Sequence, residues 1–280
     1  MPQPETPAPD PAPGVITLGR AGKKTTLGGR TRVIVPLTGD AASLRSQVAA
    51  LASSRADIAE WRADTFLASL VGSHFVAAAD IQSELTSAAR YVTDASPVPV
   101  LATIRTFVEG GQAYLDDEEY CALVRCLAPL VGAVDVEISR DGAASLIEDA
   151  HGAGALAVAS FHDFEATPSD EVLAEVLAAM NHAGADVLKF ACTATSATDA
   201  ARVLAAQAWA REAYDRPIIG IAMGPAGAPT RLVGSALGSS ATFACLPGWA
   251  GSAPGQFTVE QARAVLDVVE RAGLGARGAE

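Results

Sequence analysis

The chain has 280 residues, half of them hydrophobic, so it can form a sizeable core in one large domain or two small ones. Its formal net charge of −12 argues against a nucleic-acid-binding face, which is usually basic, and against binding to an anionic membrane surface. Four cysteines without a CxxC pair, no apolar run of membrane-spanning length and no signal-peptide pattern predict a cytoplasmic protein with reduced thiols, rather than a disulfide-rich, zinc-framework or membrane-spanning one.

The N-terminal residues 1–14 alternate Pro and Ala with two acids and cannot contribute to a core, so they predict a disordered tail. We expect residues 15–280 to form a single folded domain. It begins with two short β patterns, Val15–Leu18 and Thr25–Leu27, on either side of the turn Gly19–Lys24. This arrangement predicts a β-hairpin.

Apolar strand patterns then alternate with amphipathic helix patterns to the end of the chain. Some helix starts carry capping signals: Asp116 with Glu119, Thr167 followed by Pro168, and Thr258 with Gln261. The expected strands are 32–37, 57–61, 98–104, 133–138, 155–160, 186–191, 217–223 and 240–245. The expected helices are 42–54, 66–90 (for the most part), 116–130, 142–151, 167–181, 198–214, 229–237 and 258–272.

Eight strand–helix units in about 250 residues predict an α/β fold, a (β/α)8 TIM barrel, with the hairpin closing the bottom of the barrel. An open doubly wound sheet is the alternative. No GlyXaaGlyXaaXaaGly follows the first strand and no GlyLys[Ser/Thr] loop is present, so no nucleotide-binding fingerprint supports that alternative.

Lys189 stands out because it is the lone lysine of the folded body, in the middle of the apolar strand 186–191. The other two lysines, Lys23 and Lys24, lie in the N-terminal turn, and elsewhere the chain uses seventeen arginines. A guanidinium stays protonated, whereas a lysine amine can become a neutral nucleophile that forms an imine with a carbonyl. The alternative is a snorkelling or ion-paired lysine at a strand end.

Polar residues gather at the ends of the predicted strands, where a barrel places its chemistry. Each has a simpler structural interpretation, as an ion pair, a solvated acid, a helix cap, a surface cation or a loop residue. Their common position at one end of a barrel favours a site. The candidates are Glu60, Arg62, Arg105, Glu109, Asp135, Glu137, His162, Lys189, Arg231, Ser252 and Gln256.

Three arginines, a lysine and a histidine in an acidic protein favour a small anionic substrate, most simply a carboxylate held by an arginine fork. The lysine offers imine chemistry and the histidine proton transfer near neutral pH, which together suggest removal of a proton next to an imine. No two histidines have ligand spacing, so we expect no metal. We place Arg231 at the start of helix 229–237, whose N-terminal amides would favour an anion.

These residues resemble type I 3-dehydroquinate dehydratase over nearly the whole chain after the tail. The specific segments are GluTrpArg, HisAspPhe and SerAlaProGlyGln, in that order around the strand lysine. The matching stretches are 56–64, 103–111, 134–138, 160–164, 185–191, 231–234 and 252–256.

The resemblance implies a homodimeric (β/α)8 barrel, without metal or cofactor, that removes water from 3-dehydroquinate in the shikimate pathway. Lys189 would form the Schiff base, His162 would move the proton, and Glu109 would orient His162. Glu60, Arg62 and Arg105 would hold ring hydroxyls, and Arg231, Ser252 and Gln256 the carboxylate side. Asp135 and Glu137 would support these groups from behind.

Two departures and two competing interpretations remain. The loop 246–252 contains GlyTrpAlaGly where the family suggests another composition, and this loop is the family's lid, so substrate affinity is the property in question. The Pro/Ala tail is also atypical, and no shikimate dehydrogenase domain follows, so we expect a standalone enzyme. A class I aldolase would also use a barrel lysine, and a catalytically silent barrel could bind an anionic metabolite, although a binder needs neither the lysine nor the histidine.

Overall fold

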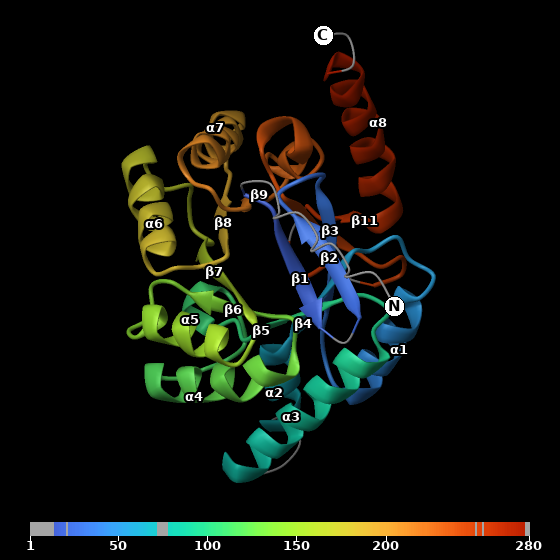
Figure 1. Cartoon of the computed structure of the whole chain (residues 1–280), viewed down its shortest axis with the longest axis vertical. Helices are drawn as coiled ribbons and strands as arrows, with labels where there is room; N and C mark the ends of the chain where they lie inside the picture. The colour runs from blue at the N-terminus through green and yellow to red at the C-terminus, as the bar shows by residue number, and fades with distance from the viewer. Residues whose placement is uncertain (1–13, 21, 72–77, 250, 254, 278–280) are drawn as a thin grey trace, which may run out of the picture.

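Nine parallel strands form one curled sheet in the computed structural model, which describes residues 14–20, 22–71, 78–249, 251–253 and 255–277 (Figure 1). The predicted tail 1–14 lies outside these residues except for Gly14. The sheet contains β3 (Arg32–Leu37), β4 (Ile58–Arg62), β5 (Val100–Thr103), β6 (Ala133–Glu137), β7 (Leu156–Asp163), β8 (Val187–Thr193), β9 (Ile218–Met223), β10 (Ala241–Cys245) and β11 (Phe257–Thr258). The first eight confirm the predicted strands, and the ninth was not predicted.

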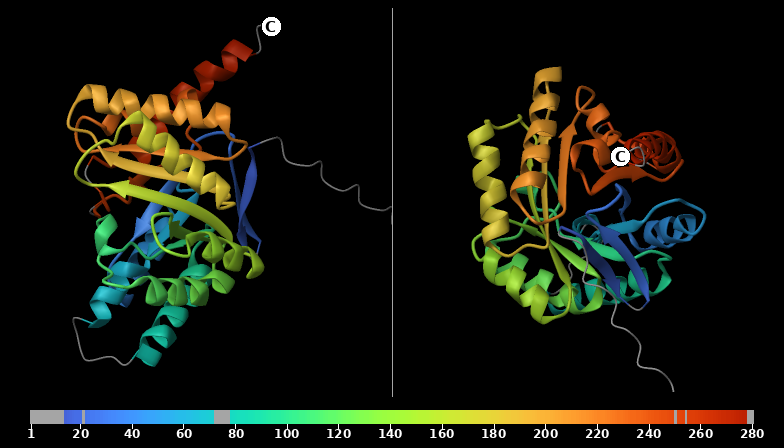
Figure 2. Two further views of the ribbon diagram at one scale, coloured as in Figure 1. Left: turned by 90° about the vertical axis from the view of Figure 1, so that its left-hand side faces the viewer. Right: turned by 45° about the horizontal axis from the view of Figure 1, so that its top comes forward.

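Helices pack around the outside of the sheet (Figures 1 and 2). They are α1 (Ala41–Leu51), α2 (Ala63–Val71), α3 (Ala78–Ala95), α4 (Asp117–Leu127), α5 (Ala143–Gly152), α6 (Asp170–His182), α7 (Ala197–Ala213) and α8 (Val259–Arg277). The predicted span 66–90 is thus two helices. None of the helices in the described ranges combines the length and apolarity needed to span a bilayer.

The capping predictions are confirmed for two helices and wrong for one. Asp116 and Glu119 form a reciprocal capping box, and Thr258 exchanges hydrogen bonds with Gln261. Helix α6 is capped by Ser169 rather than Thr167. Thr167 instead donates its hydroxyl to the Thr193 carbonyl at 2.9 Å, which ties the loop after β7 to the end of β8.

Two elements between β9 and α8 differ from the prediction. The expected helix 229–237 is a pair of short 3₁₀ helices, η3 (Ala228–Arg231) and η4 (Gly234–Leu237). Further 3₁₀ turns are η1 (Phe107–Glu109) and η2 (Ala128–Leu130). The Gly-rich composition of 224–238 explains the short turns, because glycine lowers the stability of a continuous helix.

The strand order is β11-β10-β3-β4-β5-β6-β7-β8-β9, so the eighth barrel strand lies beside the first. The barrel closes between β9 and β10 at their starting ends, where Ser240 N donates to Ile218 O at 2.7 Å. Further along, Ala244 and Cys245 of β10 pair instead with Phe257 and Thr258 of β11. The short strand β11 thus follows the loop 246–256 and anchors it on β10.

The hairpin of β1 (Ile16–Arg20) and β2 (Lys23–Leu27) lies across the end of the barrel from which the strands start (Figure 2, left). Leu18 and Leu27, each 1% exposed, pack with the first inward-facing residues of the strands, Ile34, Ile58 and Val158 among them. Lys23 bonds to main-chain carbonyls in the last turn of α3, and Arg20 to carbonyls in η2 and at the end of α5, which precede β6 and β7. The prediction that the hairpin closes the bottom of the barrel is confirmed.

Candidate active site

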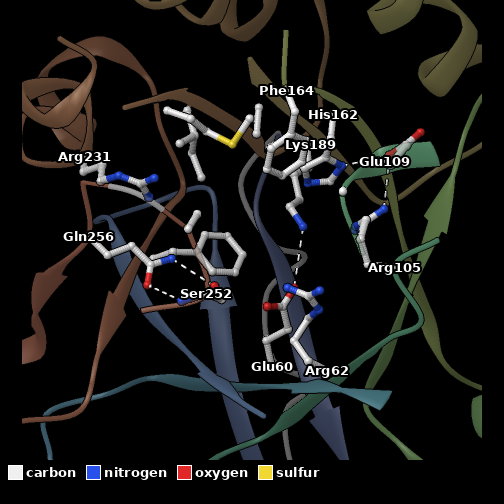
Figure 3. A pocket seen from close by; sticks show the side chains of 16 residues that line it. Glu60, Arg62, Arg105, Glu109, His162, Phe164, Lys189, Arg231, Ser252 and Gln256 are labelled. Carbon is white, nitrogen blue, oxygen red and sulfur yellow. Dashed lines mark hydrogen bonds and ion pairs between the residues drawn. The ribbon is translucent and has the colours of Figure 1, made fainter. Parts of the chain in front are cut away.

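A pocket of about 480 Å³, part of it open to solvent, lies at the opposite end of the barrel, where the strands end (Figure 3). Nine of the eleven residues predicted from the sequence line it. They are Glu60, Arg62, Arg105, Glu109, His162, Lys189, Arg231, Ser252 and Gln256. Asp135 and Glu137, the other two, are buried and contact the pocket residues from behind.

Lys189 projects from β8 into the barrel with 3% of its surface exposed. Its Nζ donates to Asp135 Oδ2 at 3.0 Å and lies 3.6 Å from Glu60 Oε1. The ring of Phe243, with its centroid 5.0 Å from Nζ, covers the amine on another side. The paired carboxylates explain how a lysine can stay in an apolar strand, because a buried charge needs partners.

Asp135 and Arg105 form the centre of a buried ionic cluster beneath the pocket. Arg105 Nη2 donates to Asp135 Oδ1 at 2.7 Å, and Ser160 Oγ donates to the same oxygen at 2.6 Å. Burial alone raises the pKa of Asp135, but the positive charges of Arg105 and Lys189 outweigh it and hold the pKa at about 2. Asp135 is therefore ionised near neutral pH.

Glu137 fixes the loop that carries Glu109. Its Oε1 accepts from Arg105 Nη1 at 3.0 Å and from Thr106 N at 2.8 Å, and its Oε2 accepts from Thr106 Oγ1 at 2.7 Å. The strand that holds Glu137 is itself pinned by Tyr120, whose hydroxyl accepts from Glu137 N at 3.0 Å. The loop after β5 therefore starts from a rigid base.

His162, at the end of β7, faces Glu109: its Nδ1 lies 2.9 Å from Glu109 Oε2. Burial, and then the positive charges of Arg105, Lys189 and Arg62, lower the pKa of His162 well below its usual value. Burial raises the pKa of Glu109 to about 7, although Arg105 opposes the rise. The imidazole is thus neutral near neutral pH, and with Nδ1 on Glu109 its Nε2 is the ring nitrogen left for a substrate.

The ion pair between Glu60 and Arg62, weighed as a structural alternative, is not what the structure shows. Glu60 accepts from Thr103 Oγ1 at 3.0 Å and faces Lys189. Arg62 forms a fork with Asp64, through Nε and Nη2 at 2.7 Å each. Asp64 is fully buried and also accepts from Gln112 N at 3.1 Å, so it joins Arg62 to the loop after β5.

Arg231, Ser252 and Gln256 lie across the pocket from His162 and Glu109 (Figure 3). Gln256 Nε2 donates to Ser252 Oγ at 3.0 Å, and Ser252 N donates to Gln256 Oε1 at 3.1 Å. Arg231 ends η3 instead of starting a helix, so the predicted helix N-terminus at this place is wrong. Its side chain is 2% exposed, and burial lowers its pKa to about 10, so the alternative of a surface cation is wrong for this residue.

Sequence reasoning missed several residues in the pocket wall and several that contact the pocket residues from behind. Ser160 and Asp64 lie inside the stretches that matched the family, and their spacing from His162 and Arg62 could have marked them. The apolar wall carries no comparable signal, because its members read as ordinary core residues. That wall is formed by Phe164, Ala191, Ile221, Met223, Phe243 and Ala253.

Within the described ranges, no group of three or more His, Cys, Asp and Glu side chains is arranged to hold a metal ion. The expected absence of a metal stays a prediction. The pocket contains a buried amine, a neutral imidazole beside a carboxylate, and cations on both sides. Such a set can bind an anion, attack a carbonyl and move a proton.

A family model for type I 3-dehydroquinase matches residues 33–272. The 3-dehydroquinate dehydratase of Klebsiella pneumoniae (strain 342) is 35% identical over 247 residues, which cover 86% of this chain and 94% of that protein. That of Neisseria meningitidis strain MC58 is 35% identical over 255 residues, or 89% and 96%. The crystal structure of 3-dehydroquinate dehydratase from Geobacillus kaustophilus superposes with a TM-score of 0.83 at 29% identity, covering 92% and 97%.

Proposed function

Because this chain belongs to the type I 3-dehydroquinase family, it is a 3-dehydroquinate dehydratase, and we propose that Lys189 is the residue that forms its Schiff base. The enzyme removes water from 3-dehydroquinate with syn stereochemistry and gives 3-dehydroshikimate. The observation that carries the assignment of Lys189 is a buried amine in the pocket, 3.0 Å from Asp135 and 3.6 Å from Glu60. The family match favours dehydration over the aldol cleavage of a class I aldolase.

Imine formation begins when the neutral amine of Lys189 attacks the C3 carbonyl of the substrate. The ammonium proton of Lys189, released before the attack, returns to the hydroxyl of the resulting carbinolamine, which then leaves as water. The iminium that remains withdraws electrons from C2 and makes its proton acidic. Asp135, with a pKa of about 2, stabilises the positive charge throughout and does not take up the amine proton. The water lost here returns when the product imine is hydrolysed, so the net loss is the C1 hydroxyl and the C2 proton.

His162 then removes the C2 proton through Nε2, and the electrons of the broken C–H bond form an enamine. The imidazolium returns the proton to the C1 hydroxyl, which leaves as water on the same face. Glu109 on Nδ1 holds the ring and stabilises the transient positive charge. A histidine with a strongly lowered pKa suits this role, since it is ready as a base near neutral pH.

The substrate is held from two sides. Arg231, with Ser252 and Gln256, binds the carboxylate, and the buried cation in an otherwise apolar wall supports this assignment. Glu60, Arg62 and Arg105 meet ring hydroxyls. Arg62 and Arg105 already have carboxylate partners. They therefore offer the substrate hydrogen-bond donors in fixed positions, and their charges are already balanced.

Several further properties are inferred from the family resemblance and the composition. The enzyme works as a homodimer in the cytoplasm, as one catalytic domain over residues 15–280, without metal or cofactor. Its small-molecule partner is the anionic substrate, and its net charge of −12 makes nucleic acid and anionic membranes poor partners. Light scattering on the purified protein tests the dimer, and activity after treatment with a chelator tests the absence of a metal.

Borohydride trapping tests Lys189. Incubation of the protein with 3-dehydroquinate and borohydride is expected to inactivate it irreversibly, because reduction makes the imine a stable amine. Mass spectrometry should place the adduct on the peptide with Lys189. Lys189→Ala and Lys189→Arg should give no adduct, although arginine keeps the charge. An adduct on Lys23 or Lys24, or none at all, would exclude this mechanism.

His162→Ala is the matched variant for the proton-transfer step. It should fold and still bind substrate, with turnover lower by about 10²–10⁴-fold, the usual contribution of general acid–base catalysis. Turnover is followed as the ultraviolet absorbance of the conjugated product. Near wild-type turnover in this variant would remove His162 from the mechanism.

A further inference from the structure

Glu109 is held through both oxygens of its carboxylate, by different partners. Oε2 lies 3.2 Å from Arg105 Nη1 and 2.9 Å from His162 Nδ1. Oε1 accepts from the hydroxyl of Ser139 at 2.9 Å. Among the hydrogen bonds of the described residues, Ser139 supplies the one donor to Oε1. Ser139, Glu109 and His162 therefore form a chain that ends on the base of the reaction.

The position of Ser139 does not depend on Glu109. It lies in a turn after β6 that is closed by a hydrogen bond from Arg140 N to Glu137 O at 3.2 Å. The preceding residue, Ile138, bonds through N to Ser160 O at 2.9 Å, and Arg140 is held by Asp117 and the Leu115 carbonyl. The backbone is fixed from both sides, so loss of the Ser139 hydroxyl should leave the turn in place.

We propose that Ser139 is a positioning residue of the dehydration: its hydroxyl fixes the rotation of the Glu109 carboxylate so that Oε2 stays on Nδ1 of His162. The inference rests on the proposed role of His162 as the proton carrier. Without this bond, Oε1 would be a buried oxygen without its donor, and the carboxylate could turn or take up a proton. Either change removes the acceptor that keeps the Nδ1 proton in place and Nε2 free for the substrate.

The groups around Glu109 determine whether loss of the Ser139 hydroxyl raises or lowers the pKa of Glu109. A hydrogen bond to a carboxylate favours its ionised form. Burial and the neighbouring acids raise the pKa of Glu109 to about 7, and the charge of Arg105 and the hydrogen bond from Ser139 oppose this rise. Removal of the hydroxyl should therefore raise the pKa further. The titratable and charged groups nearby are Arg62 on β4, Arg105 after β5, Asp135 and Glu137 on β6, Arg140 in the turn, His162 on β7 and Lys189 on β8.

The test is the pH profile of kcat/KM for Ser139→Ala. Its acidic limb should move to higher pH by about one unit, within the range expected for one hydrogen bond to a charged group. The variant would then be about tenfold slower than the wild type at the acidic end and equal to it at high pH. Ser139→Thr keeps a hydroxyl and should restore the limb. Ser53→Ala, which removes an exposed hydroxyl at the end of α1, serves as the matched control.

A second measurement does not need turnover. The ring resonances of His162 in the resting protein, identified by comparison with His162→Ala, should report the titration of Glu109, and the midpoint should rise in Ser139→Ala. An unchanged midpoint together with an unchanged profile would overturn the inference, and so would a loss of activity that is equal at every pH and is not restored by threonine. A wild type without dehydratase activity would instead refute the proposed function, and the resonances would still decide the role of Ser139.

Discussion

At the scale of single residues, the site works by giving each ionisable group one environment and one task. Asp135, with a pKa of about 2, is a permanent anion beneath Lys189. His162 is neutral near neutral pH, because burial and then the positive charges of Arg105, Lys189 and Arg62 lower its pKa well below its usual value. Glu109, whose pKa is about 7, is the group between these extremes. Neighbouring groups can serve separately as acid, base and charge stabiliser when their environments give them different pKa values.

Arg231 is the residue whose role can be tested by the most conservative change. Arg231→Lys keeps a positive charge but loses the planar fork that can hold a carboxylate through two parallel bonds. We expect KM to rise by about 10–150-fold, the equivalent of one hydrogen-bonded charge, and kcat to fall as well, because a substrate misplaced by about 1 Å can react ~10²-fold more slowly. Steady-state kinetics on the variant measure both effects.

Arg90→Lys, an exposed change on α3, is the control for this substitution. Because Arg231 is buried, a melting curve must accompany the kinetics. A lower melting temperature with unchanged KM would show that Arg231 stabilises the loop between β9 and β10 and does not contact the substrate.

At the scale of elements, the parallel register of the strands explains why distant residues meet. Glu137, Ser160 and Lys189 are register partners on β6, β7 and β8 and so lie in one row across the barrel interior. Asp135, two residues before Glu137, points the same way, because side chains alternate along a strand. Val158 and Val187, the register partners in the row of Asp135, belong to the apolar layer that Leu18 and Leu27 of the hairpin cover.

Substitutions in the hairpin should therefore change the free energy of unfolding without changing kcat. Leu18→Ala removes a side chain that is 1% exposed, and such substitutions typically cost about 2–5 kcal/mol in the free energy of unfolding. We expect a lower midpoint in urea and a kcat close to the wild-type value at temperatures where the variant is folded. Val268→Ala on α8, where the side chain is 57% exposed, should change neither. A large loss of kcat in folded Leu18→Ala would show that the two ends of the barrel are coupled.

Much of this architecture could be predicted from the sequence because its signals are local. Alternating apolar strands and amphipathic helices predict the barrel, and a lysine in an apolar strand marks the residue proposed to form the Schiff base. The two errors share a cause. The residues around Thr167 and Arg231 are typical of a helix start, but tertiary contacts at Thr167 and the glycines around Arg231 favour other local structures. The fork between Arg62 and Asp64 and the bond from Ser139 to Glu109 depend on side-chain directions across separate strands, which no periodicity encodes.

At the scale of the whole molecule, the buried site makes stability depend on pH. The pKa of Glu109 is raised above its ordinary value of 4.5 to about 7, so the native state disfavours its ionised form. Its contribution to the free energy of unfolding is therefore greatest below about pH 4.5 and is lost as the pH rises to about 7. His162 acts in the opposite sense, because a histidine buried in neutral form loses stability as the pH falls below its ordinary value.

Glu109→Gln isolates the first of these effects, since the amide resembles a carboxyl group that stays neutral. Relative to the wild type, the variant should gain stability between pH 5 and pH 8, by up to the order of 3 kcal/mol for a shift of this size. Melting curves at the two pH values measure the gain, and Glu84→Gln, an exposed change on α3, is the control. A gap between variant and wild type that stays constant with pH would contradict the raised pKa of Glu109.

The pairing of β10, the eighth barrel strand, with β3, the first, also has a kinetic consequence for how the protein folds. Strands β5 to β8 each pair with a neighbour in sequence, so Glu109, His162 and Lys189 can be brought together through connections that each contain a single α-helix. Closure instead joins β10 to β3 across about 200 intervening residues, which carries a larger entropic barrier. Ser252 and Gln256 reach the pocket only after that step, because their loop is anchored on β10 through β11. During refolding, the catalytic groups should therefore assemble first, and the affinity for a carboxylate ligand should appear last.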